Sequence, residues 1–151
     1  MLSQESFSII EGSTDSEYIF ALLLDAYKKY STDPDALLKA TVDTVHLIQE
    51  LVKPFDNQKG ETTLNLGITD GDQVICTRFS TGTKHLSLYY SPSLVFQKEL
   101  NQWQQDKTMD FTSGTVIASE PLNGNRSEWT EVPKNHLVHI TKTRECKVIA
   151  L

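Results

Sequence analysis

The sequence has 151 residues, of which 38% are hydrophobic and 23% are charged, and its formal net charge is −6. That length is typical of one domain, and that composition is typical of a globular chain rather than a disordered one. The few basic residues are scattered through an acidic chain, which excludes the basic surface that nucleic-acid binding needs, so we expect no nucleic-acid partner.

Two helices are predicted in the first third of the sequence. Thr14-Asp15-Ser16-Glu17 has the pattern of a capping box, and Glu17–Tyr30 after it has apolar residues at helical spacing. A second helix is predicted to begin with Asp33 as its cap and Pro34 at the first helical position, and to stop at Pro54. Its predicted apolar stripe comprises Leu38, Thr41/Val42, Val45, Ile48 and Val52.

After Gly60 the pattern changes to strands. Leu64, Leu66 and Ile68 alternate with polar residues or glycine, Asp70-Gly71 supplies a hairpin turn, and Val74–Phe79 returns. Further strands are predicted at Leu86–Tyr90, Thr115–Ser119, Leu137–Thr141 and Lys147–Leu151, with Ser91–Ser113 as a long polar connection. Two helices followed by mostly antiparallel strands predict an α+β fold.

Three segments in order along the chain form a recognisable pattern. They are Gly12–Glu17 (G-S-T-D-S-E); Leu64–Gly71 with Thr77-Arg78-Phe79 and Ser87–Ser91; and Val116–Leu122 with Trp129 and Val132–His136. Together they resemble the class II glutamine amidotransferase family, and the spacing is closest to the branch that includes the glutathione-degrading amidotransferase-like subunit of fungi. The resemblance implies a four-layer αββα sandwich of the N-terminal-nucleophile hydrolase type. Residues 1–151 would be the C-terminal portion of one such domain.

The resemblance also implies a chemistry. An N-terminal cysteine attacks a γ-carboxamide or γ-glutamyl carbonyl, and its own α-amino group is the general base. The aspartate of the T-D-S-E segment, which is Asp15 here, holds the substrate α-ammonium; the dipole of the helix that it begins stabilises its carboxylate. The alternative is that Asp15 is only a helix N-terminal acid. Thr14, Ser119 and Glu120 are further candidates for substrate contacts, and the alternative for the last two is that they simply close a strand.

The nucleophile itself is not in this sequence. Residue 2 is Leu, so removal of Met1 would expose no Cys, Ser or Thr, and no H-N-G segment for oxyanion stabilisation occurs. We therefore expect the substrate-pocket half of a hydrolase for glutamine or a γ-glutamyl compound such as glutathione, inactive alone. The fungal branch implies a peptidase-like partner subunit. The alternative is a non-catalytic product that keeps only a binding or assembly surface.

No metal or cofactor is expected. Cys76 and Cys146 lack CxxC spacing and are interpreted as buried reduced thiols, and His136 and His139 would point to opposite faces of a strand. The start of the sequence has no signal-peptide pattern, and no run approaches the roughly 20 apolar residues of a membrane span. We expect a cytoplasmic chain without a membrane partner.

Overall fold

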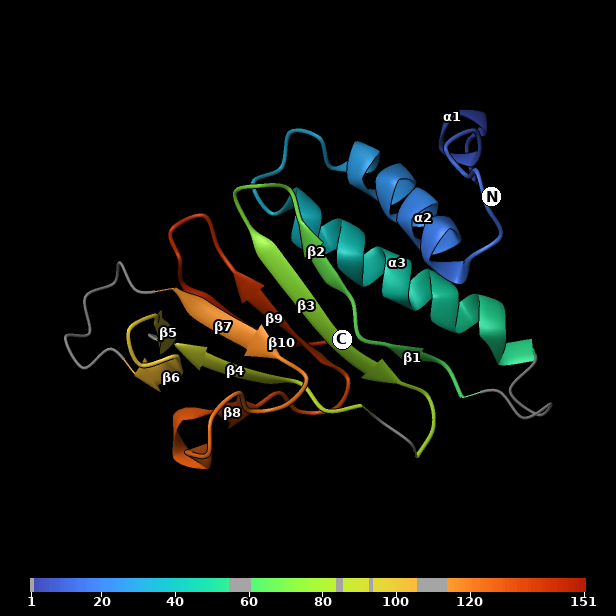
Figure 1. Cartoon of the computed structure of the whole chain (residues 1–151). Coiled ribbons are helices and arrows are strands. Elements are labelled where there is room, and N and C mark those ends of the chain that lie inside the picture. The colour runs from blue at the N-terminus through green and yellow to red at the C-terminus, as the bar shows by residue number, and fades with distance from the viewer. Residues whose placement is uncertain (1, 55–60, 84–85, 93, 106–113) are drawn as a thin grey trace. The chain divides into compact units, whose positions relative to one another are not determined.

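The computed structural model describes residues 2–54, 61–83, 86–92, 94–105 and 114–151. The chain divides into two compact units, Met1–Gly60 with the helices and Glu61–Leu151 with the strands (Figure 1). Every strand pair among the described residues is antiparallel. The predicted α+β class, with helices first and antiparallel strands after them, is confirmed. None of the described helices has the length and apolar character needed to cross a membrane.

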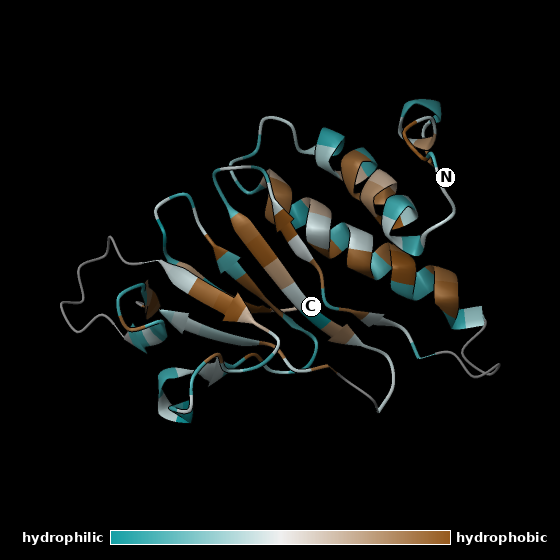
Figure 2. Cartoon of the chain, in the orientation of Figure 1, coloured by the Kyte–Doolittle hydropathy of each residue, from teal (hydrophilic) through white to brown (hydrophobic). Residues whose placement is uncertain are grey.

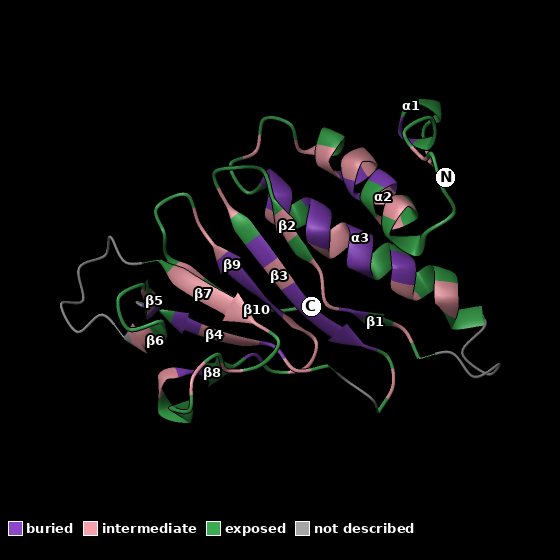
Figure 3. Ribbon diagram, in the orientation of Figure 1, coloured by how far each residue is buried: buried purple, intermediate pink, exposed green. Residues whose placement is uncertain are grey.

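Three helices form the first unit: α1 (Gln4–Phe7), α2 (Asp15–Lys29) and α3 (Ala36–Val52). The predicted capping box is present, because the Thr14 hydroxyl oxygen accepts the Glu17 amide and the Glu17 carboxylate accepts the Thr14 amide. Helices α2 and α3 pack against each other, and both carry buried positions (Figure 3).

Helix α3 begins later than predicted. The Asp33 carboxylate accepts the Asp35 amide at 2.8 Å, as a cap would, but α-helical geometry starts only at Ala36. The predicted stripe is right at Thr41, Val45 and Ile48, whereas Leu38, Val42 and Val52 are only partly buried. The buried face includes the small residues Ala40 and Thr44, which a count of large apolar side chains overlooks.

The short helix α1, which was not predicted, is attached to α2 through polar side chains of α2, Asp25 and Lys28. Asp25 on α2 accepts the Ser3 amide and the Ser3 hydroxyl, each at 2.6 Å, and also the Ser6 hydroxyl. Led by the Ser3 hydroxyl, these bonds stabilise the charged form and lower the pKa of Asp25 to about 2. Because polar contacts hold α1 in place, hydrophobic periodicity did not reveal it.

The second unit contains two facing sheets and a separate hairpin. The larger sheet has the order β1-β3-β9-β10 with β2 also paired to β3, the smaller has the order β7-β4-β8, and β5 pairs with β6. The strands are β1 (Thr63–Leu64), β2 (Gly67–Thr69), β3 (Val74–Ser80), β4 (Tyr89–Pro92), β5 (Leu94–Gln97), β6 (Gln102–Gln105), β7 (Thr115–Ala118), β8 (Thr130–Glu131), β9 (His136–Ile140) and β10 (Cys146–Ala150). A short 3₁₀ helix, η2 (Arg126–Glu128), precedes β8.

A buried apolar cluster lies between the two sheets. Leu88, Val132 and Val138 form its centre, and partly buried residues of both sheets pack against it, among them Tyr90 of β4 and Ile140 of β9. Figure 2 shows hydrophobic residues along β3 and β7, one strand from each sheet. The cluster therefore joins the two sheets face to face within the second unit.

Strands β1 and β2 are two halves of the strand predicted around Leu64–Ile68. Both pair with β3 in one continuous register. The ladder is interrupted because the Thr77 hydroxyl donates to the Leu64 carbonyl at 2.7 Å and accepts the Leu66 amide at 3.0 Å. The predicted hairpin turn is present as a four-residue loop between Thr69 and Val74, with Gly71 at φ +94°, which suits glycine.

The predicted long connection Ser91–Ser113 is wrong where the structure describes it. Strand β4 continues to Pro92, and β5 and β6 form a hairpin in which Phe96 lies opposite Trp103, with ring centroids 5.3 Å apart. A cross-strand aromatic pair stabilises a hairpin, whereas the glutamines around it favoured a loop interpretation. Residues 106–113 of this prediction lie outside the described residues. Strand β4 also begins at Tyr89 rather than Leu86.

Candidate functional site

Asp15 is the first residue of α2, and its side chain is exposed. Its Oδ1 accepts the Ser16 amide at 2.8 Å and the Ser16 hydroxyl at 3.5 Å. Within the described part of the chain no basic side chain pairs with it. The unsatisfied amides of the first helical turn favour negative charge here. Asp15 therefore presents a carboxylate that is available to an ammonium group.

Glu17 fixes the backbone that leads into Asp15. Its carboxylate accepts the Gly12 amide at 2.9 Å, the Thr14 amide at 3.3 Å and the Thr14 hydroxyl at 2.9 Å. These bonds, the Thr14 hydroxyl first, lower the pKa of Glu17. A Cβ at Gly12 would lie 2.6 Å from a Glu17 carboxylate oxygen, so a side chain here would displace the end of the Glu17 side chain. The Thr14 hydroxyl, a predicted substrate contact, is engaged in the cap as both donor and acceptor.

Ser119 and Glu120 are exposed and follow directly after β7. The Ser87 hydroxyl donates to Glu120 Oε1 at 3.4 Å. Ser87 lies two residues before β4, and β4 pairs antiparallel with β7, so the end of one strand lies beside the beginning of the other. The two predicted residues therefore occupy the edge of the small sheet where β7 ends.

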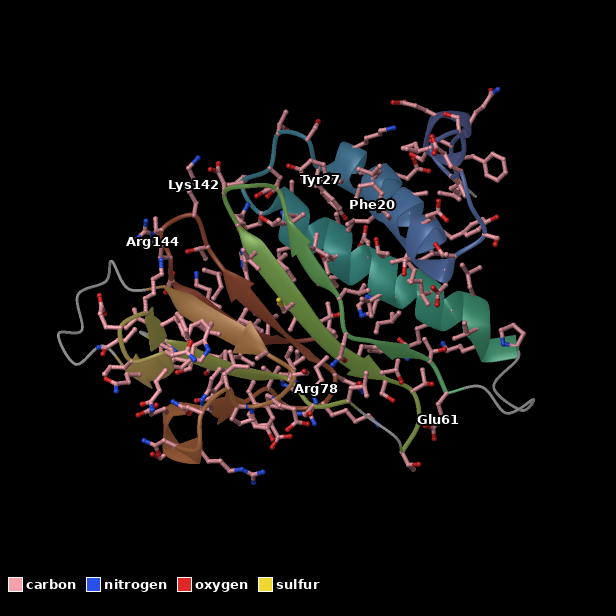
Figure 4. All side chains as sticks on the ribbon, viewed as in Figure 1. Phe20, Tyr27, Glu61, Arg78, Lys142 and Arg144 are labelled. Carbon is pink, nitrogen blue, oxygen red and sulfur yellow. The ribbon has the colours of Figure 1, made fainter. Side chains whose placement is uncertain are left out.

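A buried arginine lies behind this edge and joins the two sheets. Arg78 on β3 is 4% exposed; its Nε donates to the Leu86 carbonyl at 2.8 Å, and its Nη1 donates to the Glu131 carboxylate at 2.8 Å and to the Val132 carbonyl (Figure 4). It has the same strand parity as Cys76, which packs against the inter-sheet cluster. The guanidinium is tolerated in this position because several acceptors bond it.

Asn65, between β1 and β2, bonds Ser87, the residue that follows the Leu86 bonded by Arg78. Its Nδ2 donates to the Ser87 carbonyl at 3.2 Å, while its buried Oδ1 has no hydrogen-bond partner in the described part of the chain. Asn65 and Arg78 thus bond the carbonyls of the consecutive residues Ser87 and Leu86. Both residues lie in the segments that resemble the family, but the sequence predicted no role for either. The available signal was an arginine at a core-facing position of an apolar strand.

The two cysteines are not activated nucleophiles. Burial raises the pKa of the Cys76 thiol to about 11, and burial also raises the pKa of Cys146. Both are free thiols that pack against the inter-sheet cluster. A thiol with a raised pKa is protonated near neutral pH and reacts slowly. Among the described residues, no three His, Cys, Asp or Glu side chains gather in a way that could hold a metal ion.

The predicted site residues fall into two groups. Thr14 and Asp15 lie together at the start of α2 in the helical unit, and Ser119 and Glu120 lie together after β7 in the strand unit. Each group is an exposed carboxylate on backbone that other side chains hold in place. Such an arrangement can bind ammonium or N–H groups, and it contains no group suited to nucleophilic attack.

Comparison with known proteins places the chain in a family. The family described as glutamine amidotransferases class-II matches residues 3–150. A probable glutamine amidotransferase, DUG3 of Saccharomyces cerevisiae, is 31% identical over 156 residues, which cover 93% of this chain and 44% of the yeast protein. The solved structure of a glutamine aminotransferase class-II domain protein from Silicibacter pomeroyi matches with a TM-score of 0.57 and 23% sequence identity. The match covers 99% of this chain and 57% of the bacterial chain, and it shows that the two share a fold.

The chain therefore spans less than half of the yeast relative and somewhat more than half of the bacterial structure. The family match covers all three segments that carried the resemblance, from Gly12–Glu17 to Val132–His136. On this basis the chain belongs to the class II glutamine amidotransferase family.

Proposed function

We propose that this chain is the substrate-pocket half of an amidotransferase-like hydrolase of the N-terminal-nucleophile type, the C-terminal portion of a single domain. Its substrate is glutamine or a γ-glutamyl compound such as glutathione. The observation that carries the proposal is Asp15, an exposed carboxylate at the first residue of a capped helix, in the segment that the family resemblance assigns to the substrate α-ammonium. In the strand unit, Ser119 and Glu120 are further candidate contacts for a polar group of a γ-glutamyl substrate.

The nucleophile in this proposal comes from sequence outside these 151 residues, and so do the groups that stabilise the oxyanion. The cysteine sulfur attacks the γ-carbonyl, the tetrahedral intermediate collapses with release of ammonia or an amine that takes up a proton, and water cleaves the thioester to free glutamate. Asp15 anchors the other end of the glutamyl group, which fixes the γ-carbonyl relative to the sulfur. Alone, the chain releases no ammonia.

Two further parts of the proposal concern the setting. We propose a cytoplasmic, reducing compartment, a view that the two free thiols support. We also propose a peptidase-like partner subunit, which would take the product of γ-glutamyl cleavage.

The test is Asp15→Asn in the longest protein whose reading frame contains these residues. Asparagine also suits a helix start but cannot pair its charge with an ammonium. A lost charge-assisted hydrogen bond of about 1.5–3 kcal/mol predicts a kcat/KM lower by about tenfold to a hundredfold, since each 1.36 kcal/mol is tenfold. The matched control is Asp35→Asn, the same change at the N-cap of α3, where no side-chain cap bond exists; its kinetics should be unchanged.

The alternative function is a non-catalytic product that retains a binding or assembly surface. It predicts that glutamate and ammonia release stay at background even in the longer protein, while titration calorimetry still detects binding of a γ-glutamyl compound. Unchanged kinetics in Asp15→Asn, in a protein that does turn over, would reject Asp15 as a substrate contact.

A further inference from the structure

Asn65 has a buried oxygen, Oδ1, to which none of the residues that the structure describes donates a hydrogen bond. An unmatched buried acceptor is a net destabilising feature, and in a folded protein it calls for an explanation. For stability alone, an apolar side chain of similar size would serve at this position at least as well. What Asn65 adds is its other group, the Nδ2 that donates to the Ser87 carbonyl at 3.2 Å.

The segment Leu86–Leu88 that Asn65 contacts belongs to no strand, yet all three of its carbonyls are bonded. Arg78 Nε holds the Leu86 carbonyl at 2.8 Å, Asn65 holds the Ser87 carbonyl, and the Val132 amide holds the Leu88 carbonyl at 2.8 Å. The continuous register of β1 and β2 with β3 places Asn65 opposite Arg78. Two neighbouring side chains therefore clamp two consecutive carbonyls.

This clamped segment contains a hydroxyl that donates to Glu120: Ser87 Oγ lies 3.4 Å from Glu120 Oε1. Glutamate at an exposed position otherwise samples many rotamers, and a ligand must order it on binding. A fixed Ser87 backbone aims the hydroxyl and reduces that cost. We propose that Asn65 is a positioning residue, which holds Ser87 so that Ser87 orients the Glu120 carboxylate toward an N–H donor of the γ-glutamyl substrate.

The inference rests on the proposed function, because that function places Glu120 in the substrate pocket. In the longest active protein, Asn65→Leu should raise KM by about threefold to tenfold, the effect of one neutral hydrogen bond, with kcat within twofold. Its melting temperature should change little, since removal of the orphan Oδ1 offsets the loss of the Nδ2 bond to the Ser87 carbonyl. A purely structural Asn65 predicts the reverse, a lower melting temperature with KM unchanged.

A double-mutant cycle tests the route through Ser87. Ser87→Ala should raise KM as Asn65→Leu does, and the double variant should be no worse than either single one, because both changes break one chain of contacts. Ser87→Thr keeps the hydroxyl and should restore KM. Independent effects that multiply in the double variant would overturn the inference, because Asn65 would then act by another path.

A readout without turnover separates this inference from the proposed function. In the 151-residue chain with ¹³C-labelled glutamate, the Glu120 carboxyl signal is identified by its loss in Glu120→Gln. Ser87→Ala should shift that signal, and Asn65→Leu should shift it in the same direction. A shift with Ser87→Ala but none with Asn65→Leu overturns the inference. Absence of γ-glutamyl cleavage in every longer protein would refute the proposed function instead. An unchanged KM in Glu120→Gln would show that Glu120 does not contact the substrate, and the inference would fail with it.

Discussion

Replacing Arg78 by methionine removes the hydrogen bonds by which this side chain connects the two sheets. The buried Val132 carbonyl would lose its Arg78 donor, which costs about 1–3 kcal/mol, and the Leu86 carbonyl would lose its donor at a smaller cost because Leu86 is exposed to water. The Glu131 side chain is 53% exposed, so it returns to water and adds less than about 1 kcal/mol. Methionine avoids the desolvation of a guanidinium, which offsets part of the loss. We expect the free energy of unfolding to fall by about 2–5 kcal/mol.

Glu131→Gln separates the charge attraction of Arg78 from its bonds to the carbonyls. Glutamine still accepts a hydrogen bond from Arg78, and only the charge attraction at a half-exposed pair is lost, so we expect a change below about 1 kcal/mol. Arg126→Met is the matched control, the same substitution at an exposed position of η2 in the same unit, with an expected effect within about 0.5 kcal/mol.

The assay is urea unfolding followed by tryptophan fluorescence. Both tryptophans, Trp103 and the buried Trp129, belong to the strand unit, so the signal reports on the unit that contains Arg78. Linear extrapolation gives the free energies, and each 1 kcal/mol lost should lower the melting temperature by about 2–4 °C. A cost for Arg78→Met below 1 kcal/mol, or no larger than that of Glu131→Gln, would show that the carbonyl bonds do not hold the sheets together.

Three further predictions follow from the described contacts. The pKa of Cys76 is raised from 9.0 to about 11, so its neutral thiol stabilises the fold below pH 9, and this contribution of about 2–3 kcal/mol should be lost as the pH rises toward 11. Urea unfolding at pH 8 and at pH 10.5 should show this loss for the wild-type chain and not for Cys76→Ala. The pKa of Asp25 is lowered from 3.8 to about 2, so the contribution of this carboxylate to stability is present above pH 4 and lost as the pH falls toward 2. Ser3→Ala removes the hydroxyl bond and should raise that pKa in an NMR titration; an unchanged value would exclude the Ser3 hydroxyl as the main cause. Thr14→Ala removes the N-cap hydroxyl of α2 and should lower the free energy of unfolding by about 1 kcal/mol while changing kcat/KM less than twofold. Thr14→Ser should leave both nearly unchanged, whereas a larger effect of Thr14→Ala on kcat/KM would make Thr14 a substrate contact.

Local signals in the sequence predicted the elements whose stabilising contacts are close in sequence. The capping box depends on Thr14 and Glu17, three residues apart, and the hairpin at Gly71 depends on a turn that needs a positive φ. The missed elements depend on contacts that sequence patterns do not display. Helix α1 is held by Asp25, some twenty residues away, and the β5–β6 hairpin by an aromatic pair surrounded by glutamines.

The same distinction applies to the candidate site. Asp15 could be identified because its segment is contiguous and resembles a family motif. Asn65 and Arg78 lie in the segments that resemble the family, but their roles could not be predicted from the sequence. The Asn65 partner lies 22 residues away, and the Arg78 partners lie 8, 53 and 54 residues away. Only the pairing of β1 and β2 with β3, and the facing of the two sheets, brings these groups to the segment before β4.

The two candidate carboxylates, one in each unit, stand on or beside irregular backbone that side chains, rather than regular secondary structure, hold in place. Glu17 bonds the amides of Gly12 and Thr14 ahead of Asp15, and Asn65 and Arg78 bond the carbonyls of the segment that contacts Glu120. Irregular segments fixed in this way present functional groups from a rigid scaffold, which lowers the entropy lost when a ligand binds. Glu17 and Arg78 are the charged groups committed to the backbone, and Asp15 and Glu120 are the ones left exposed. In each unit, therefore, one charged group fixes the backbone while an exposed carboxylate stays available to a ligand.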